Sequence, residues 1–430
     1  MRLRRGSLGH RTGTDDPRSD RPDPSTCPAA SLPRRSGAHF NPAVTLLERM
    51  TGFVGTRPAG PSERTPTGKT DPMSEVTIPE SPIGVDADWL NAALVGWPTV
   101  ASVSHEDIGE GTGIFGQISR LQVDYDGDAG DSPTRMVVKM ACLEPENLAI
   151  ANALGIYERE LRFYEELAAT LPFRVPASHV LHRGDDGRFV LIIEDLSGEY
   201  VVGDQVVGAT PEQAEAIVDT LVPFHVQWWE HPDLDAMDWL PVPNAPAYRA
   251  AVPGIYRAGL PVLEADWADK ISPAALAAAK AVEPKFEELM DRTSEAPRTV
   301  IHTDTRLDNI LFAADGSNEV AVIDFQLALR GRAVADIVYL IGTSMSIEDG
   351  AANWEPLLRR WHGGIVATGI EYPWDDCVLH YKEAAMYYLS GAMSLVGTFD
   401  AGNERGAAMV HEYTTRILEH VADIQATDVL

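Results

Sequence analysis

Three residues with oxygen-bearing side chains stand at spacings that suit phosphate and metal chemistry. Asn309 follows Asp304 by five residues, and Asp324 follows Asn309 by fifteen. Two apolar runs on either side of Asp315 and Gly316 predict an antiparallel hairpin between Asn309 and Asp324. Because paired strands lie about 4.8 Å apart, the residues at the two roots of this hairpin are expected to be neighbours. Amide and carboxylate oxygens of this kind are ligands that Mg²⁺ accepts when it is bound as a nucleotide complex.

The loop before this hairpin carries further groups with a chemical use. Asp304 is expected to face the same space without being a metal ligand, where it would accept a proton from a substrate hydroxyl. His302 is expected to be a structural hydrogen-bonding residue and not an acid or base. Arg306 is expected either to neutralise a transferring phosphoryl group or to form a salt bridge with Asp308 or Asp336.

A lysine and a glutamate farther up the chain are predicted to form a pair. Lys139 ends an apolar strand, where a solvent-exposed side chain is the alternative. Glu160 shares one helical stripe with Tyr157, Leu161 and Tyr164, so it faces inward. Burying that carboxylate without a partner would cost several kcal/mol, and Lys139 is the obvious cation nearby.

A glycine-rich segment precedes this lysine. Gly111, Gly113 and Gly116 match the pattern G-x-G-x-x-G, which occurs both in dinucleotide-binding folds and in loops that cover phosphates. Apolar and polar residues alternate over 121–125, which predicts a strand after the glycines. A strand favours a hairpin flap over a dinucleotide-binding turn, which needs a helix N-terminus there. The alternative, a nicotinamide-dependent dehydrogenase, predicts binding of NADH.

The elements that must position these residues fall into two groups. A helix over 86–94, three strands, a long helix over 146–169 and a hairpin around 184–187 predict a small sheet with one long helix against it. Beyond residue 197 the pattern is mostly helical, with helices expected over 211–230, over 273–290 and from 335 to the end. We therefore expect an α+β fold with a β-rich N-lobe at 76–195, a helical C-lobe at 196–430 and a ligand site between them.

Composition separates residues 1–75 from the rest of the chain. The 430 residues are 44% hydrophobic and 23% charged, as in ordinary globular proteins, but residues 1–72 hold 10 of the 30 prolines. We interpret residues 1–75 as a disordered tail or a mis-assigned start, with Met73 as the alternative first residue.

Charge and cysteine content limit the partners and the compartment. Residues 1–72 carry a net charge of +5, and the rest of the chain carries −34, which disfavours nucleic acid as a partner. An acidic body would attract a small cationic substrate, although it often serves only solubility. Three widely separated cysteines indicate a reducing, cytoplasmic location. No apolar run is long enough to predict a membrane span or a secretory signal.

Two of these motifs together resemble those of a known family. His302-x-Asp304-x-x-x-x-Asn309 and the later Asp324-Phe325-Gln326 are similar to the catalytic and metal-binding loops of the protein-kinase-like superfamily, specifically the aminoglycoside phosphotransferase and choline kinase group. The segments HTDTRLDNILF and VIDFQ resemble the ecdysteroid-kinase-like (CHK kinase-like) branch most. The resemblance covers roughly residues 100–400 and implies a protein-kinase-like two-lobed fold.

The resemblance also implies roles for single residues. Lys139, held by Glu160, would contact the phosphates of the nucleotide, and the glycine segment would cover them. Backbone groups from Glu194 to Leu196 would hydrogen-bond adenine at a hinge between the lobes. Asp336 would brace the catalytic loop, and Gln326, where protein kinases have glycine, argues against an activation-loop switch.

These observations predict an ATP- and Mg²⁺-dependent small-molecule O-phosphotransferase. The alternative is a catalytically silent, nucleotide-binding pseudokinase that acts as a regulatory or scaffold module. A small molecule with a hydroxyl group is the expected partner, and the oligomeric state is not predicted. Its binding site is expected in residues 228–267, where Asp233, Asp235 and Asp238 would receive an amine or Trp228 and Trp239 would stack on a ring; an ordinary packed loop is the alternative.

Overall fold

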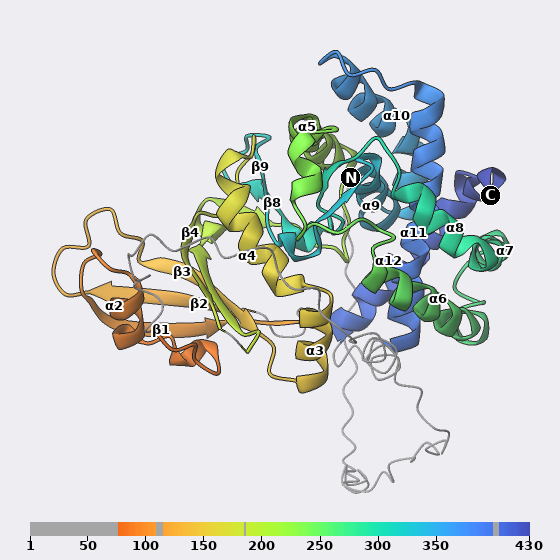
Figure 1. Ribbon diagram of the computed structural model, residues 1–430. Coiled ribbons are helices and arrows are strands. Elements are labelled where there is room, and N and C mark those ends of the chain that lie inside the picture. The colour runs from red at the N-terminus through yellow and green to blue at the C-terminus, as the bar shows by residue number, and fades with distance from the viewer. Residues whose placement is uncertain (1–75, 109–114, 185, 399–403) are drawn as a thin grey trace, which may run out of the picture. The chain divides into compact units, whose positions relative to one another are not determined.

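A five-stranded antiparallel sheet forms the N-terminal part of the chain (Figure 1). Its strands lie in the order β1-β2-β3-β5-β4. Their bounds are β1 Val100–Asp107, β2 Gly116–Tyr125, β3 Arg135–Ala141, β4 Ser178–Arg183 and β5 Phe189–Glu194. The predicted hairpin around residues 184–187 is confirmed, since β4 and β5 pair antiparallel.

The computed structural model describes residues 76–108, 115–184, 186–398 and 404–430. The predicted tail at 1–75 lies outside the described residues, as do Gly111 and Gly113 of the glycine segment.

The two faces of the sheet have different cores because side chains alternate along a strand. Met136, Val138 and Met140 of β3 pack on one face with the short helix α2 (Ala87–Ala93). Lys139 lies between them in sequence, so it points to the opposite face, where Leu191 of β5 is its register partner. The second face packs against helix α4 (Ile156–Glu166), and this register brings Lys139 under that helix.

The long helix predicted over 146–169 is wrong, because the chain forms two helices there. Helix α3 spans Pro145–Ala153, and α4 starts at Ile156. Gly155 between them has φ 67°, a left-handed conformation that interrupts a right-handed helix. The amphipathic stripe with Glu160 therefore belongs to α4 alone.

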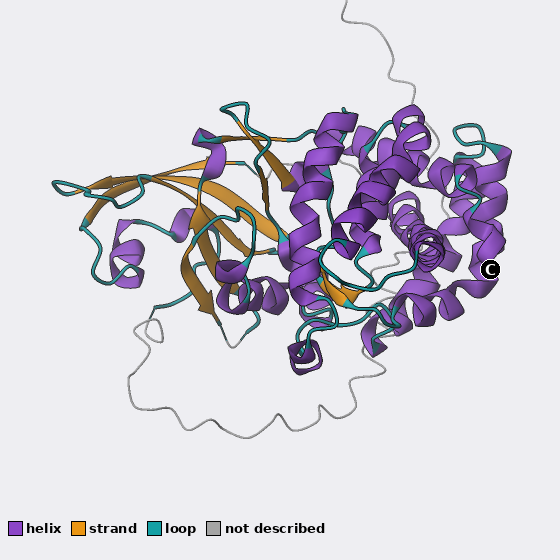
Figure 2. Cartoon of the chain, turned by 90° about the horizontal axis from the view of Figure 1, so that it is seen from above, coloured by secondary structure: helices purple, strands orange, loops and turns teal. Residues whose placement is uncertain are grey.

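Helices dominate the chain after β5 (Figure 2). Their bounds are α5 Pro211–Trp228, α6 Pro246–Asp266, α7 Pro273–Val282, α8 Phe286–Thr293, α9 Val334–Ser344, α10 Ile347–Val366, α11 Trp374–Thr398 and α12 Glu404–Asp423. The single helix predicted over 273–290 is also wrong, since a 3₁₀ turn at Glu283–Lys285 separates α7 from α8. The predicted α+β fold, with an antiparallel N-terminal sheet and a helical C-terminal region, is confirmed.

Residues 229–245, with Trp239 and the three predicted aspartates, form the packed loop offered as the alternative, and residues 246–266 form the 21-residue helix α6. This helix packs against α11. Gly259 permits the close approach, because a Cβ atom at that position would lie 2.2 Å from the carbonyl oxygen of Met393. Any larger residue at position 259 would push the two helices apart.

Short strands among the helices position the catalytic loop. The predicted hairpin is confirmed as β8 (Ile310–Ala313) and β9 (Val320–Val322), which form a sheet with β6 (Tyr200–Val202) in the order β6-β8-β9. Gly316 in its turn has φ 80°, which favours glycine. Strands β7 (Thr299–Ile301) and β10 (Leu329–Gly331) pair with each other, and β8 pairs with β6 and β9, so the loop between β7 and β8 is held at both ends.

Two properties bear on the environment of the chain. Within the described residues, no helix combines the length and apolar character needed to span a bilayer. Cys142 and Cys377 are buried free thiols.

Candidate functional site

Lys139 lies at the centre of a buried ion cluster. Its Nζ atom is 2.9 Å from Oε1 and 2.8 Å from Oε2 of Glu160, and 3.0 Å from Oδ1 of Asp324. The side chain is 7% exposed, so the predicted pair with Glu160 forms and the exposed-lysine alternative is wrong. Burial alone would lower the pKa of Lys139, but the charges of Asp324 and Glu160 raise it above its usual value.

One ammonium group therefore pairs with two carboxylates, and the pKa values of these two carboxylates shift in opposite directions. Burial raises the pKa of Glu160 to about 7, because the attraction of Lys139 does not fully offset the loss of water. Burial also opposes ionisation of Asp324, but Lys139 and Arg306 outweigh it and hold the pKa of Asp324 below its usual value. Asp324 is thus the carboxylate that keeps its charge.

The backbone after β9 turns Asp324 toward the cluster. Asp324 has φ 66°, which is uncommon for a residue with a side chain and marks a constrained position. The next residue, Phe325, stacks on Phe163 of α4 with ring centroids 3.7 Å apart, and the ring centroids of Phe325 and His302 are 4.5 Å apart. This aromatic contact fixes the turn against the helix that carries Glu160.

Asn309 links Asp304 to Ile323, the residue before Asp324. Its backbone oxygen accepts a hydrogen bond from Ile323, the residue before Asp324, at 3.0 Å. Its Nδ2 atom donates to the backbone oxygen and to Oδ2 of Asp304, both at 3.0 Å. Asn309 and Asp324 are therefore neighbours at the roots of the hairpin, as predicted. In the amide group of Asn309, the Oδ1 atom lies on the opposite side from Nδ2, the atom that holds Asp304.

Asp304 has a further partner that the sequence analysis missed. The hydroxyl of Tyr339, on α9, donates to Oδ1 of Asp304 at 2.7 Å. Burial and then the charge of Asp304 raise the pKa of Tyr339 well above its usual value, so the phenol stays protonated. The available signal was spacing, because Tyr339 stands three residues after Asp336 on one helix and shares its face.

Asp336 braces the catalytic loop, as the resemblance implies. Its carboxylate accepts hydrogen bonds from the backbone N–H groups of His302 and Thr303, each at 2.8 Å. His225 of α5 contacts Oδ2 of Asp336 at 3.1 Å and accepts a hydrogen bond from the indole of Trp361 at 3.0 Å. A buried chain of contacts thus fixes the backbone two residues before Asp304.

His302 has the structural role expected of it. Its Nδ1 atom accepts a hydrogen bond from the backbone N–H of Asp304 at 3.2 Å, and its Nε2 atom lies 2.9 Å from the carbonyl oxygen of Ile323. The neutral ring with a proton on Nε2 satisfies both contacts. His302 therefore ties the catalytic loop to the end of β9.

Arg306 pairs with neither of the two aspartates offered as salt-bridge partners. Its Nε atom lies 3.7 Å from Oδ2 of Asp304, whose charge raises the pKa of the guanidinium further. Asp308 instead pairs with Arg405 at 3.0 Å, and Asp336 is occupied by the loop backbone. Arg306 thus lies beside the predicted base.

Gly116, the last glycine of the glycine segment, begins β2 directly beside the lysine. A Cβ atom there would lie 3.3 Å from the carbonyl oxygen of Met140 and 3.7 Å from Cε of Lys139. Because Gly116 leads into an antiparallel strand and not into a helix, the dinucleotide-binding turn of a dehydrogenase is wrong.

The predicted hinge runs from Glu194 to Leu196. The N–H group of Glu194 already donates to Ala177, and its carboxylate pairs with Arg174 at 2.5 Å. The carbonyl oxygen of Leu196 accepts a hydrogen bond from Glu199, and its side chain is buried. These groups are occupied by the chain itself, and adenine binding by this segment stays a prediction.

The residues of 228–267 that were predicted to bind the acceptor make other contacts. Asp235 pairs with Arg330 and Arg298, and Asp238 pairs with Arg162, so these carboxylates serve surface ion pairs. Trp228 and Trp239 are buried in the core, and Asp233 contacts His231. None of these residues lines the cavity that opens beside Asp304, but Pro243 and Tyr248 of the same predicted segment do.

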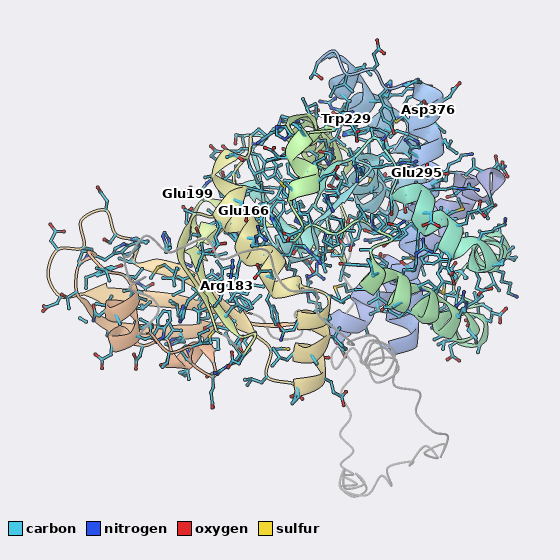
Figure 3. All side chains as sticks on the ribbon, viewed as in Figure 1. Glu166, Arg183, Glu199, Trp229, Glu295 and Asp376 are labelled. Carbon is cyan, nitrogen blue, oxygen red and sulfur yellow. The ribbon has the colours of Figure 1, made fainter. Side chains whose placement is uncertain are left out.

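That cavity has a volume of about 340 Å³ and is walled by residues of α6, α8, α9, α11 and α12, of strands β7 and β10, and of the catalytic loop. Asp304 and Arg306 form part of its wall, next to Tyr339. Figure 3 draws the side chains on the ribbon and labels Glu166, the last residue of α4. The predicted base therefore lies in the wall of this cavity.

The residues of the site fit a divalent cation such as Mg²⁺. Asp324 and Asn309 offer a carboxylate and an amide oxygen, which are hard ligands. Among the described residues, no group of three or more His, Cys, Asp or Glu side chains gathers around one point. A cation here would need oxygen ligands from a nucleotide or water, which is how Mg²⁺ is commonly held.

Comparison with known proteins identifies the family. A sequence model of the Phosphotransferase enzyme family (APH) matches residues 133–372. An uncharacterized kinase-like protein of Caenorhabditis elegans is 26% identical over 230 residues; the match covers 50% of this chain and 58% of the length of that relative.

Solved structures of low sequence identity are also similar. A putative aminoglycoside phosphotransferase from Ralstonia eutropha is 17% identical, with a TM-score of 0.47, over 80% of this chain and 97% of that chain. A choline kinase from Cryptosporidium parvum is 10% identical, with a TM-score of 0.45, over 76% of this chain and 88% of that chain.

The family match includes β3 with Lys139, helix α4, the catalytic loop and the turn at Asp324. It spans more than half of the 430 residues. The chain therefore belongs to the Phosphotransferase enzyme family.

Proposed function

We propose that this chain transfers the γ-phosphoryl group of ATP, bound with Mg²⁺, to a hydroxyl group of a small molecule. The observation that carries this proposal is the position of Asp304. Its carboxylate contacts Asn309 on one side and lines the cavity beside α9 on the other. A base in that position lies between the predicted nucleotide side and an acceptor.

On the nucleotide side, Lys139 would bind the phosphates while Glu160 holds its ammonium group in place. Gly116 leaves room for a covering loop next to that lysine. Asp324 and the Oδ1 atom of Asn309 would hold Mg²⁺, which supplies positive charge against the β- and γ-phosphates when bound. The low pKa of Asp324 keeps that ligand ionised.

On the acceptor side, Asp304 would orient the hydroxyl and take its proton. The acceptor O–H bond breaks as its oxygen bonds to the γ-phosphorus, the bond from that phosphorus to the β-phosphate oxygen breaks, and ADP leaves. Arg306, beside Asp304, would neutralise charge on the transferring group. Catalysis of this kind rests mainly on positioning and charge.

The test is transfer of a labelled phosphoryl group. The full chain would be incubated with γ-labelled ATP, Mg²⁺ and a pool of small hydroxylated molecules, and labelled products would be separated by chromatography. We expect a labelled small molecule, which disappears when EDTA removes Mg²⁺. Nucleotide binding without a labelled product would favour the silent pseudokinase and overturn the proposal.

A further inference from the structure

Gln326 follows Asp324 by two residues and contacts its carboxylate directly. The Nε2 atom of Gln326 lies 3.3 Å from Oδ2 of Asp324, so the amide group donates a hydrogen bond to this oxygen. The other oxygen, Oδ1, accepts a hydrogen bond from Nζ of Lys139 at 3.0 Å. Each carboxylate oxygen of the predicted metal ligand therefore has its own side-chain donor.

These two donors differ in charge and in the other partners they would have. Lys139 also pairs with Glu160 at 2.8 Å, and under the proposed function its ammonium group would contact the phosphates of the nucleotide. Gln326 is a neutral donor, so it holds Oδ2 of Asp324 without cancelling the negative charge that attracts a divalent cation. Within the part of the chain that the structure describes, Lys139 and Gln326 are the side chains that donate to Asp324. Gln326 is therefore the donor that remains when Lys139 contacts phosphate.

The backbone of Gln326 is held by helix α4. Its carbonyl oxygen accepts a hydrogen bond from Nη1 of Arg159 at 3.0 Å, and Nη2 of the same arginine donates to the carbonyl oxygen of Leu154 at 2.8 Å. Leu154 lies in the break between α3 and α4. Because Arg159 is only 1% exposed, its guanidinium group is fixed in the interior. Arg159 therefore fixes the main chain from which the side chain of Gln326 extends.

The catalytic loop holds the main chain on either side of Asp324. The Nε2 atom of His302 lies 2.9 Å from the carbonyl oxygen of the residue before Asp324, and the hydroxyl of Thr303 donates to the carbonyl oxygen of Leu327 at 2.7 Å. With the main chain held at both places, rotation of the Asp324 side chain is the freedom that remains. The hydrogen bond from Gln326 limits this rotation.

Packing alone does not account for a glutamine at this position. Phe325 and Ala328 of the same turn are the residues buried in the core, whereas Gln326 is half-buried. Protein kinases have glycine here, and glycine has no side chain that could hold the carboxylate. The contact with Asp324 is therefore the feature that a glutamine adds to this turn.

From this arrangement we infer that Gln326 is a positioning residue for the metal site. Its amide group holds the carboxylate of Asp324 in the orientation that binds Mg²⁺ together with the nucleotide. Loss of a hydrogen bond to a ligating carboxylate typically lowers metal affinity by about 10–100-fold. This inference rests on the proposed function, because it requires Asp324 to be a metal ligand.

The experiment measures metal binding, with Mn²⁺ as a paramagnetic substitute for Mg²⁺. The full chain is mixed in excess with a non-hydrolysable ATP analogue, and electron paramagnetic resonance of free Mn²⁺ gives the dissociation constant of the metal. Gln326→Met keeps the length of the side chain and removes its hydrogen-bond donor. We expect the dissociation constant for Mn²⁺ to rise about 10–100-fold, while the affinity for the analogue in EDTA stays close to that of the native chain.

Gln227→Met is the matched control. Gln227 is a half-buried glutamine of α5, and its amide group donates to the hydroxyl of Thr170 at 3.2 Å. This variant should bind Mn²⁺ like the native chain. Native affinity for Mn²⁺ in Gln326→Met would overturn the inference. An equal loss of affinity for Mn²⁺ and for the analogue in EDTA would also overturn it, because such a loss indicates a merely structural role.

Asp324→Asn separates failure of this inference from failure of the proposed function. If Asp324→Asn weakens Mn²⁺ binding and Gln326→Met does not, the metal site stands and the role assigned to Gln326 is wrong. If Asp324→Asn and the native chain bind Mn²⁺ equally, the proposed metal site is overturned, and the inference with it.

Discussion

The ammonium group of Lys139 lies 3.0 Å from the Oδ1 atom of Asp324, so an ion pair joins the sheet to the turn after β9. The same ammonium group contacts both carboxylate oxygens of Glu160. A cation that neutralises Asp324 would leave Lys139 to Glu160 and to the phosphates of a nucleotide. Lys139 therefore has the partners needed to exchange Asp324 for the phosphates of a nucleotide when one binds.

Glu160→Gln should change how stability depends on pH. Glu160 binds its proton more tightly in the folded chain, with its pKa raised from 4.5 to about 7. Its contribution to stability is therefore fully present below about pH 4.5 and is lost as pH rises through about 7. Glutamine does not titrate, so the free energy of unfolding of the variant relative to the native chain should rise between about pH 5 and about pH 8. Urea denaturation at both pH values measures this difference.

Glu158→Gln is the control for that measurement, because Glu158 is an exposed residue of the same helix. The free energy of unfolding of Glu158→Gln should differ little from that of the native chain at either pH. If the difference in free energy of unfolding between Glu160→Gln and the native chain did not vary with pH, it would contradict the raised pKa of Glu160.

Asp324→Asn should remove the effect of Mg²⁺ on nucleotide binding. The amide lacks the charge that the low pKa of Asp324 maintains, so it is a weaker ligand for a divalent cation. Calorimetric titration with ATP, in the presence of Mg²⁺ and of EDTA, should give similar affinities for the variant and different affinities for the native chain. Asp315→Asn, at the exposed tip of the hairpin, should behave like the native chain. A variant that keeps the full Mg²⁺ effect would argue against Asp324 as a ligand.

Tyr339→Phe should slow turnover while leaving nucleotide binding intact. The variant removes the hydrogen bond of 2.7 Å that holds Oδ1 of Asp304 and keeps the buried ring. A hydrogen bond to a charged group contributes about 1.5–3 kcal/mol, so kcat should fall about ten-fold or more. Steady-state kinetics should show no change in KM for ATP. An unchanged kcat would mean that the hydroxyl of Tyr339 does not position the base.

Asp336→Ala should destabilise the fold. The carboxylate accepts hydrogen bonds from His302 and Thr303 and contacts His225, and all three partners would be left unsatisfied in the interior. We expect the free energy of unfolding to fall by roughly 3–5 kcal/mol, as when one partner of a buried pair is removed. Chemical denaturation measures the loss. A decrease below about 1 kcal/mol would show that water replaces the bracing contacts.

Sequence periodicity predicted the pair between Lys139 and Glu160 but not the ion pair between Lys139 and Asp324. Alternation along β3 puts Lys139 on one face of the sheet, and the three-to-four spacing of α4 puts Glu160 on the facing stripe, so both orientations follow from local rules. The hairpin likewise places Asn309 next to the residue before Asp324. These contacts depend on short segments whose geometry is regular.

Other parts of the site depend on tertiary packing that periodicity does not specify. An apolar stripe such as the one on α11 looks the same whether it faces a core or a cavity. The acceptor site was expected in residues 228–267, of which Pro243 and Tyr248 line the cavity, while α9, α11 and α12 supply much of its wall. The break at Gly155 was missed because a glycine inside a helical pattern is often tolerated. Tyr339 was missed because its partner, Asp304, lies on another element.

The most direct test of the account is the rate of phosphoryl transfer by Asp304→Asn. The amide keeps the size of the side chain but does not take a proton, so kcat for transfer from γ-labelled ATP should fall about 10²–10⁴-fold. The dissociation constant for ATP with Mg²⁺ should stay close to that of the native chain. A variant that transfers the label at the native rate would contradict the assignment of Asp304 as the base and, with it, the proposed mechanism.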